Sequence, residues 1–289
     1  MKITVKANAK INLMLDILST LENGYHELFM IMQSVDLYDT VSVEKKDGDG
    51  IDISCNVSDI PCDERNIAHK AASAFFDYTK NEGRGIKINI EKRIPHAAGL
   101  AGGSADGAAV IVALNKLFET KLSEKEIINI GAQVGSDVPF CALGGTMMAQ
   151  YTGTILSHLP DLTKKHIIIV KPDQDVSTGK AYAAFDSAER VRHLDTKGMM
   201  TACINNDWSS IADKAGNVFE QFIEVADRAV IKSVMRHHGC LCCCMSGSGP
   251  SIFGIFEDES KAEKCLEELR KDYVNSYLCQ TVETGCEII

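Results

Sequence analysis

The chain has 289 residues, 45% of them hydrophobic, which is enough to bury one large core or, as we expect here, the cores of two domains. Its 30 basic and 40 acidic residues give a formal net charge of -10, which argues against a nucleic-acid-binding protein, because such proteins hold phosphates with basic surfaces. The amino-terminal residues form no long apolar stretch and no run approaches the roughly 20 apolar residues of a membrane span, so we expect a cytoplasmic protein.

The first segment of the chain alternates between apolar and polar residues, as a half-buried strand does. One face carries Val5, Ala7, Ala9, Ile11, Leu13, Leu15 and Ile17, and the other carries Lys6, Lys10, Asn12 and Asp16. A lysine and an amide therefore project on the same side. An Asn-Gly pair at 23–24 predicts a turn, and a strand follows it through Val43.

A helix is predicted from about Ile67 to Tyr78, followed by a strand in which isoleucines alternate with polar residues over 86–91. Pro95 ends this strand, and a loop of glycine and alanine leads into a helix that ends near Phe118. Ser104 or Asp106 is the expected cap of that helix.

The glycine loop, residues 94–104, is the most informative stretch of the sequence. Its glycines let the backbone approach a ligand, and its N–H groups lie beside a helix N-terminus, which favours an anion such as phosphate. It lacks the lysine of the common P-loop and the spacing of the dinucleotide fingerprint. Small residues that merely let a helix pack tightly on a sheet remain an alternative interpretation.

Ser123 and Glu126 form a capping-box pattern, so a helix is expected from there to Gly135. The run Gly-Ser-Asp-Val-Pro-Phe over 135–140 follows. Taken alone, Asp137 in this run is better explained as a turn former than as a catalytic residue, and Lys10 is likewise explained by a solvated strand position.

The second half of the chain is expected to form a separate domain. A strand is predicted over 144–152, and Pro160 with the charged residues after it suggests a connection, which gives domains 1–160 and 161–289. We then expect a strand over 166–170, a helix beginning near Ser177 or Thr178 and further helices to about 235. Two strands flank a glycine-rich late turn, residues 245–251, and a helix over 260–271 and a last strand follow.

Eleven cysteines, an odd number without a secretion signal, fit reduced thiols rather than a disulfide framework. The cluster from Cys240 to Cys244, near His237 and His238, invites a metal site. Neighbouring strand residues point to opposite faces, however, and the paired spacing of zinc sites is missing, so small buried apolar side chains are the favoured interpretation.

Three separated motifs together resemble the GHMP family of small-molecule kinases over almost the whole chain. They are the lysine strand with Gly24-Tyr25-His26, the glycine loop, and the late turn Met-Ser-Gly-Ser-Gly-Pro-Ser. The resemblance implies an α+β, two-domain GHMP kinase fold, with a ribosomal protein S5 domain 2-like N-terminal half and a ferredoxin-like α/β sandwich in the C-terminal half.

The resemblance also implies a kinase that uses ATP and Mg²⁺. Asp137 is expected to accept the proton of the acceptor hydroxyl, and Lys10 to orient that hydroxyl and offset the charge of the transferred phosphoryl group. The metal ligands stay open. The residues expected to hold the ATP phosphates are Pro95, His96, Ala97, Ala98, Gly99, Leu100, Ala101, Gly102, Gly103, Ser104 and Ala105.

The strand motif and the Gly-Ser-Asp-Val-Pro-Phe run look like one family member, which phosphorylates the 2-hydroxyl of a cytidine diphosphate-linked polyol for isoprenoid synthesis. The resemblance then implies that Tyr25 and Tyr182 enclose a cytosine ring whose edge His26 reads. Aromatic faces suit a nucleobase. Further acceptor or phosphate contacts are expected from Asn12, Thr178, Ser248 and Gly249.

Two positions depart from the family pattern: Ala105 replaces a common serine and Gly107 a common alanine. The expected partner is a small molecule, with no nucleic acid and no membrane, and the expected state is a monomer or a weak homodimer. A sister kinase acting on another acceptor, a nucleotide-binding regulator without catalysis and a nucleic-acid-binding module are the alternatives. The retained Lys10 and Asp137 argue against the second of these, and the acidic charge against the third.

Overall fold

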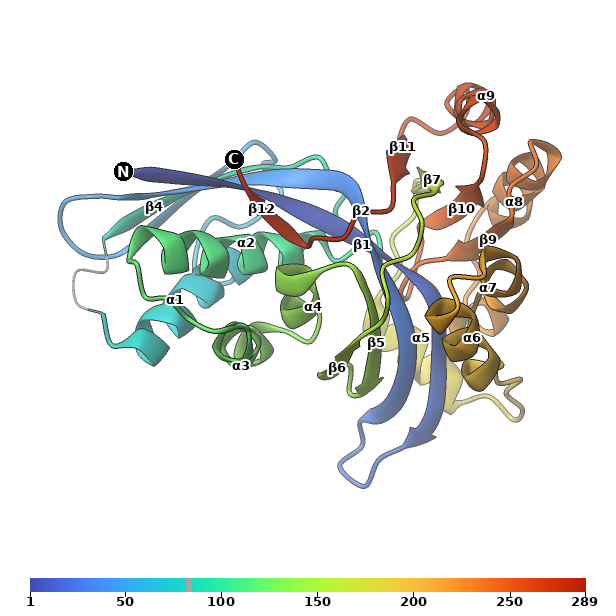
Figure 1. Ribbon diagram of the computed structural model, residues 1–289, viewed down its shortest axis with the longest axis horizontal. Helices are drawn as coiled ribbons and strands as arrows, with labels where there is room; N and C mark the ends of the chain where they lie inside the picture. Colours follow the sequence, from blue (N-terminus) through green and yellow to red (C-terminus); the bar gives the residue numbers. More distant parts are fainter. Residues whose placement is uncertain (82–84) are drawn as a thin grey trace.

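The structure, a computed structural model, describes residues 1–81 and 85–289 and contains two β-sheets that lie side by side (Figure 1). The first sheet is built on a long hairpin of β1 (Lys2–Thr20) and β2 (His26–Lys45). Its strands follow the order β12-β1-β2-β4-β3, with β3 (Ile51–Cys55), β4 (Ile86–Glu91) and β12 (Cys286–Ile288). The first part of β2 pairs instead with β5 (Thr146–Tyr151), which pairs with β6 (Ile155–His158).

Bulges interrupt the alternation that the sequence predicts for β1. The register with β2 shifts between Asn8 and Ala9, between Asn12 and Met14 and between Ile17 and Ser19. A bulge moves the residues that follow it to the other face of the sheet. The single apolar face expected from Val5 to Ile17 is therefore wrong, and the strand is buried on both faces over 7–17.

Four helices cover one face of the first sheet: α1 (Ile67–Thr79), α2 (Gly102–Leu117), α3 (Glu124–Val134) and α4 (Val138–Leu143) (Figure 1). The glycine of α2 that departs from the family pattern has a packing reason, because a Cβ on Gly107 would lie 2.8 Å from a methyl group of Ile67. The expected cap of α2 is wrong. Ala101, with a left-handed φ of 59°, precedes the helix, which begins with no side-chain cap.

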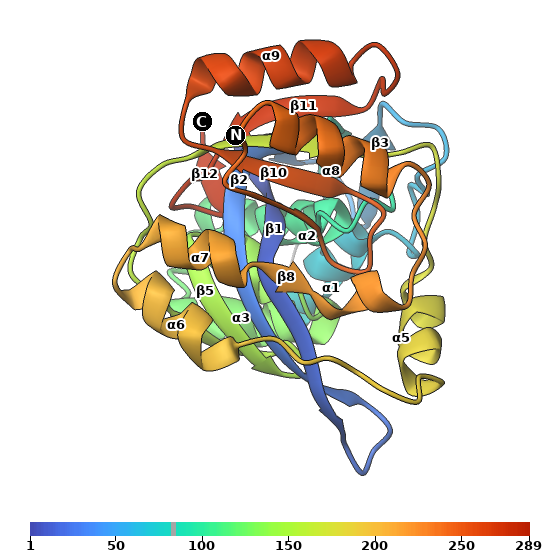
Figure 2. The ribbon, with the colours of Figure 1, turned by 90° about the vertical axis from the view of Figure 1, so that its right-hand side faces the viewer.

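The second sheet has the order β11-β7-β10-β9, with β7 (His166–Val170), β9 (Cys242–Met245), β10 (Ile252–Phe256) and β11 (Ser276–Gln280). All its neighbours are antiparallel. The helices α8 (Arg228–His237) and α9 (Glu259–Leu269) pack on it (Figure 2). With α8 before β9 and α9 before β11, this is the β-α-β-β-α-β arrangement of the expected ferredoxin-like half.

The long connection between β7 and α8 holds α5 (Thr178–Asp186), α6 (Thr196–Ile204), α7 (Trp208–Lys214), β8 (Gly216–Asn217) and the 3₁₀ turn η1 (Val218–Gln221). Two short strands of the second half, β8 and β12, pair with β1. The division of the chain at residue 160 stays a prediction, and strands from beyond it complete the first sheet.

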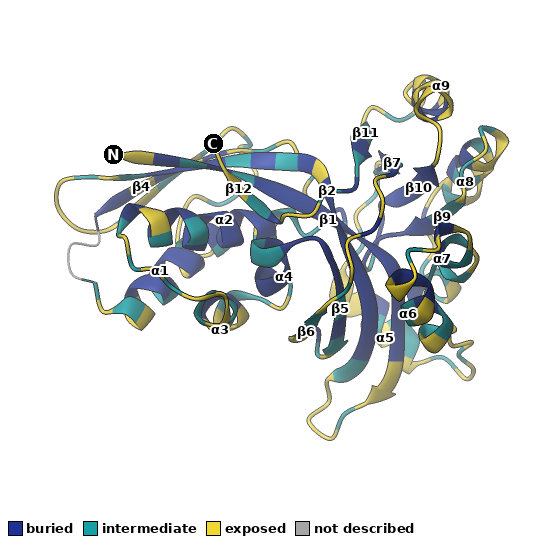
Figure 3. Cartoon of the chain, in the orientation of Figure 1, coloured by how far each residue is buried: buried dark blue, intermediate teal, exposed yellow. Residues whose placement is uncertain are grey.

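The buried residues follow both sheets and the inner sides of the helices (Figure 3). Within the cysteine cluster, Cys244 is buried as expected, whereas Cys240, Cys242 and Cys243 are only half-buried. Of the helices in the described part of the chain, none is long and apolar enough to cross a membrane.

Candidate active site

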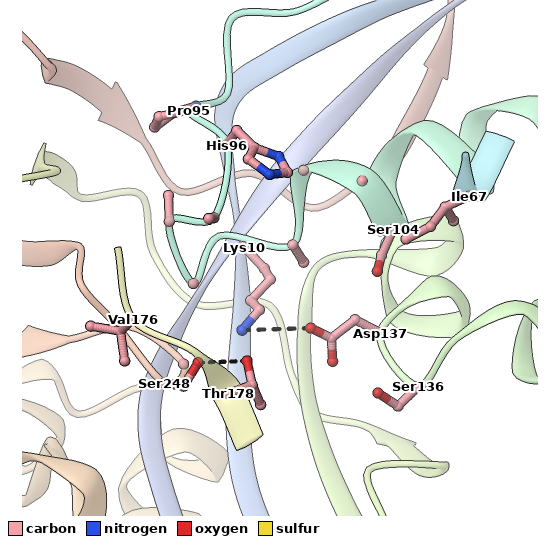
Figure 4. Close-up of a pocket in the computed structure, with 18 of the residues that line it drawn as sticks. Lys10, Ile67, Pro95, His96, Ser104, Ser136, Asp137, Val176, Thr178 and Ser248 are labelled. Atoms are coloured by element: carbon pink, nitrogen blue, oxygen red, sulfur yellow. Dashed lines mark hydrogen bonds and ion pairs between the residues drawn. The ribbon is translucent and has the colours of Figure 1, made fainter. Parts of the chain in front are cut away.

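A cavity of about 620 Å³ lies where the glycine loop, the start of α4, the start of α5 and the late turn meet (Figure 4). These segments come from both halves of the chain, and β1 passes between them. The cavity wall contains the two side chains that the family resemblance implies are catalytic, Lys10 and Asp137.

Lys10 and Asp137 lie next to each other on the cavity wall. The ammonium nitrogen of Lys10 lies 3.7 Å from Oδ2 of Asp137 (Figure 4). The Lys10 side chain is 5% exposed and that of Asp137 29%, so the carboxylate is the more accessible of the two. An ammonium and a carboxylate at this separation attract each other and leave the carboxylate free to accept a proton from a bound hydroxyl.

Asn12 fixes the position of the Lys10 ammonium. Its Oδ1 accepts a hydrogen bond of 2.7 Å from Lys10 Nζ and another of 2.9 Å from the backbone N–H of Gly247 in the late turn. Asn12 itself is fully buried and lies outside the cavity wall. The structure therefore gives Asn12 a contact with Lys10, and its predicted contact with the acceptor stays a prediction.

The glycine loop and the late turn are in direct contact. A Cβ on Gly99 would lie 2.2 Å from the carbonyl oxygen of Ser246, and the φ of Gly99 is +73°, so only glycine suits this position. The hydroxyl of Ser246 donates to the Gly99 carbonyl at 3.0 Å, and the N–H of Ser251 donates to the Ala98 carbonyl at 3.3 Å. The two segments thus form one wall of the cavity.

The amino-terminal end of α2 presents free N–H groups to the cavity. The first intrahelical hydrogen bond runs from Ala105 to Ala101, so the N–H groups up to Ser104 have no carbonyl of the helix to donate to. Gly102, Gly103 and Ser104 line the cavity. The helix dipole adds partial positive charge there, which makes this end a site for phosphate oxygens.

A buried ion cluster that the sequence analysis missed supports the glycine loop. Lys92 donates to Asp106 at 2.6 Å and also to Asp39, whose other oxygen accepts the N–H of Ile94 at 2.8 Å. Burial raises the pKa of Asp106 to about 8, although the charge of Lys92 acts to lower it. Burial alone would lower the pKa of Lys92, but the two carboxylates outweigh it and raise that pKa. The signal in the sequence for this cluster is Asp106, an acidic residue among the small and apolar residues at the start of α2.

Another part of the cavity wall comes from α5 and from apolar residues of the hairpin of β1 and β2. Thr178 lies within hydrogen-bond distance, 3.0 Å, of the hydroxyl of Ser248, and Tyr182 is on the next turn of α5. Burial raises the pKa of Tyr182 to about 12, and the charge of Asp137 adds to the shift. The apolar lining residues were missed, because in the sequence they look like core: Leu15, Leu28, Met30 and Phe219.

The predicted aromatic pair around a base is arranged differently in this structure. The ring of His26, not that of Tyr25, stacks on Tyr182, with 4.7 Å between ring centroids and an interplanar angle of 24°. His26 Nε2 also pairs with a carboxylate oxygen of Asp186 at 2.7 Å. Tyr25 lies in the turn before β2 and is 64% exposed. The stack joins the start of β2 to α5, which are far apart in the sequence, so no local pattern indicates it.

Most of the predicted binding residues reach the cavity, but five do not. Those that line it are Lys10, Pro95, His96, Ala97, Ala98, Gly99, Ala101, Gly102, Gly103, Ser104, Asp137, Thr178, Tyr182, Ser248 and Gly249. Those outside the wall are Asn12, Tyr25, His26, Leu100 and Ala105. Leu100 and Ala105 are buried, so the hydroxyl that Ala105 lacks would not be on the wall.

The oxygen donors on the cavity wall suit a small divalent cation such as Mg²⁺ if bound phosphates and waters supply the remaining ligands. Ser104, Ser136 and Asp137 provide oxygen donors on the wall. Across residues 1–81 and 85–289, no group of three or more His, Cys, Asp or Glu side chains is arranged to hold a metal. Mg²⁺ commonly takes one or two carboxylates and completes its shell with waters and substrate phosphates, and this donor set fits that habit.

Comparison with known proteins places both halves of the chain in one family. The model for the GHMP kinases N terminal domain matches residues 66–145, and that for the GHMP kinases C terminal matches residues 199–275. The 4-diphosphocytidyl-2-C-methyl-D-erythritol kinase of Clostridium acetobutylicum is 41% identical over 280 residues, which cover 96% of this chain and 99% of that protein. The protein of the same name from Clostridium perfringens is 40% identical over 286 residues, covering 97% and 99%.

Solved structures agree with this placement. A crystal structure of 4-(cytidine 5'-diphospho)-2C-methyl-D-erythritol kinase superposes with a TM-score of 0.77 at 28% identity and covers 96% of this chain and 98% of the other. The homoserine kinase of Cytophaga hutchinsonii gives a TM-score of 0.82 at 21% identity over 100% and 97% of the two chains. At that identity the second likeness concerns the fold alone.

Proposed function

The chain belongs to the GHMP kinases, and from this premise we propose that it transfers the γ-phosphoryl group of ATP to the 2-hydroxyl of 4-(cytidine 5'-diphospho)-2-C-methyl-D-erythritol. The relatives that carry the name of this kinase are about 40% identical over nearly their whole length. The observation that carries the proposal for the site is the pair Lys10 and Asp137, 3.7 Å apart on the wall of a cavity that the glycine loop also lines.

The ATP phosphates bind, in this proposal, against the glycine loop and the first turn of α2. The N–H groups up to Ser104 supply donors, and the helix dipole supplies partial positive charge, so no P-loop lysine is needed. The contact between Gly99 and Ser246 holds this wall in place before the nucleotide arrives. Preorganised donors are worth more than mobile ones, because they need no reorganisation when charge develops.

Asp137 accepts the proton of the acceptor hydroxyl, and Lys10 orients that hydroxyl and stabilises the charge on the transferred group. Phosphoryl transfer depends mostly on positioning and on stabilising charge, so one carboxylate and one ammonium are sufficient. Lys10 is well suited to this role because Asn12 accepts a hydrogen bond from its ammonium and because its side chain is only 5% exposed.

Mg²⁺ is part of the proposal. Asp137 and Ser104 would hold it together with the nucleotide phosphates, since both are on the cavity wall and bear oxygen donors. When bound, the ion neutralises charge on the phosphate oxygens.

In this proposal the cytidine end of the acceptor binds next to α5, because Thr178 and Tyr182 line the cavity there and Ser248 lies beside Thr178. For Tyr25 and Tyr182 to enclose a cytosine ring, the His26 ring has to leave the face of Tyr182 that it covers here. His26 would then be free to read the edge of the base, and the pair with Asp186 would open. A cytoplasmic monomer or weak homodimer completes the proposal.

The test is ADP release coupled to oxidation of a nicotinamide cofactor, with purified protein, ATP-Mg²⁺ and three separate acceptors. We expect turnover with 4-(cytidine 5'-diphospho)-2-C-methyl-D-erythritol and none with mevalonate or homoserine. Turnover with homoserine or mevalonate alone would assign the chain to a sister kinase. No turnover with any of the three, in a protein that still binds ATP, would favour a nucleotide-binding regulator.

A further inference from the structure

Asn217, in the two-residue strand β8, is a buried side chain outside the cavity to which the sequence gives no role. It is 5% exposed, pairs with β1 at Leu15 and does not itself line the cavity. Its Nδ2 donates to the carbonyls of Met245 and Gly247 at 2.8 and 2.7 Å, and its Oδ1 accepts the N–H of Phe219 at 3.0 Å. Every polar atom of this amide is therefore used, and two of its three bonds hold the late turn.

A second side chain, that of Glu220, also binds the backbone of Met245. Oε1 of Glu220 accepts the N–H of Met245 at 2.6 Å, while Asn217 takes the carbonyl of Met245. Both backbone polar groups of Met245 are thus held by side chains from residues 217–220 rather than only by the β9 ladder. These two hydrogen bonds fix the position at which the chain leaves β9 and enters the late turn.

The turn that Asn217 holds is in contact with the catalytic lysine. Gly247 donates its N–H to Asn12 Oδ1, the same oxygen that accepts from Lys10 Nζ. A Cβ on Gly247 would lie 3.4 Å from that nitrogen, so the backbone of the turn sits directly against the ammonium. The other contact of the Asn12 amide is a weak one, from Nδ2 to the sulfur of Met30 at 3.5 Å. The N–H of Gly247 is therefore the strong contact that orients the Asn12 oxygen toward Lys10.

From these contacts we propose that Asn217 is a positioning residue for phosphoryl transfer, which sets the place of Lys10 through Gly247 and Asn12. The inference rests on the proposed kinase function, because Lys10 has a task only in that reaction. Asn217 does not touch a substrate. Its loss should therefore slow the transfer step while leaving the binding of both substrates nearly unchanged.

The variant Asn217→Ser removes both donors to the turn. We expect kcat to fall about 10- to 100-fold, because a small displacement of a reacting group is enough for such a loss, while KM for ATP and for the acceptor changes less than about threefold. Asn115→Ser is the matched control. That amide also ties a loop, accepting from the N–H of Leu122 and the hydroxyl of Thr120 at 2.9 Å each, but it lies at the carboxyl-terminal end of α2. The Asn115→Ser variant should have the same kcat as the wild-type protein.

A double-mutant cycle with Asn12→Ala separates positioning from general loosening. If Asn217 acts through Asn12, then adding Asn217→Ser to the Asn12→Ala protein lowers the residual kcat by less than about threefold. Full multiplication of the two losses, or an unchanged kcat in Asn217→Ser alone, would overturn the inference. Asn217→Asp, which keeps the acceptor for Phe219 but replaces the donors by an acceptor, should show the same loss. If neither variant folds, as judged by thermal unfolding, Asn217 has a structural role and the proposal is wrong. If the wild-type protein showed no activity on any acceptor, the proposed kinase function itself would be refuted.

Discussion

The ammonium of Lys10, near the start of the chain, lies 3.7 Å from the carboxylate of Asp137, which precedes a helix in a different part of the fold. Each residue alone has an ordinary explanation, as a strand lysine or as a turn former. Their meeting on the wall of one cavity, beside the free N–H groups of α2, is what gives them a chemical role.

Asp137→Asn should abolish most of the activity, because an amide cannot accept the proton of the acceptor hydroxyl. We expect kcat to fall about 10²- to 10⁴-fold, the usual contribution of a general base. The dissociation constant of a non-hydrolysable ATP analogue, measured by calorimetry without Mg²⁺ because Asp137 is a proposed ligand of that ion, should stay within about threefold of its original value, since the glycine loop is intact. Asp213→Asn, a change at an exposed carboxylate of α7, serves as the control and should leave kcat unchanged. Unchanged turnover in Asp137→Asn would remove this residue as the base.

Gly99→Ala should weaken both stability and ATP binding, because the new methyl would collide with the Ser246 carbonyl at 2.2 Å. Gly24→Ala is a close control, since that glycine has a similar φ of +80° but nothing within 4 Å of an added Cβ. Both variants carry the backbone strain of roughly 1–2 kcal/mol, and only Gly99→Ala adds the clash. Urea unfolding should therefore place Gly99→Ala below Gly24→Ala in the free energy of unfolding, and KM for ATP should rise in the first alone. Equal stabilities would mean that the glycine loop and the late turn can separate at Gly99 and Ser246 without a loss of stability.

Much of the fold follows from local patterns in the sequence. The alternation of Ile86, Ile88 and Ile90 predicts β4, and the capping box of Ser123 and Glu126 predicts α3; both are confirmed. In each case neighbouring residues alone decide the structure, through side-chain period or through hydrogen bonds to nearby backbone.

The missed features depend on contacts between distant segments. The two-residue strand β8 owes its conformation to pairing with β1, and Leu13 is the extra residue of a bulge that only the register with β2 defines. The sequence suggests Asp106 as a helix cap, whereas its actual partner is Lys92, in the loop that follows β4. No local pattern records such a partner.

Tyr182→Ala should raise KM for the cytidine acceptor more than it lowers kcat, because the proposed role of the ring is to stack on the base. Stacking on an aromatic ring is worth roughly 1–3 kcal/mol per base, or about a 5- to 150-fold change in affinity. Tyr182→Phe keeps the ring and should leave KM within about threefold, and KM for ATP should not change in either variant. Steady-state kinetics with each substrate varied in turn measures all of these values. An acceptor KM that stays constant in Tyr182→Ala would place the cytosine elsewhere.

The protonation of Asp106 predicts how stability depends on pH. Its pKa is about 8 in the folded protein because of burial, against an ordinary value of 3.8. Between these two values the folded protein keeps a proton that the unfolded chain has lost, so a rise in pH favours unfolding. The contribution of Asp106 is fully present below about pH 4 and is lost as the pH rises through 8. One such proton changes the free energy of unfolding by on the order of 1 kcal/mol per pH unit.

Asp106→Asn isolates this effect, because the amide is neutral at every pH and its oxygen can still accept from Lys92. We expect the free energy of unfolding, measured by urea at pH 5, 6, 7 and 8, to fall more steeply with pH in the unchanged protein than in the variant. Groups that titrate elsewhere, such as the histidines, affect both proteins alike and cancel in the difference. Parallel pH dependences would show that Asp106 is already ionised in the folded protein at pH 5. In that case Lys92, which also contacts Asp39, would hold two carboxylates as anions beneath the glycine loop.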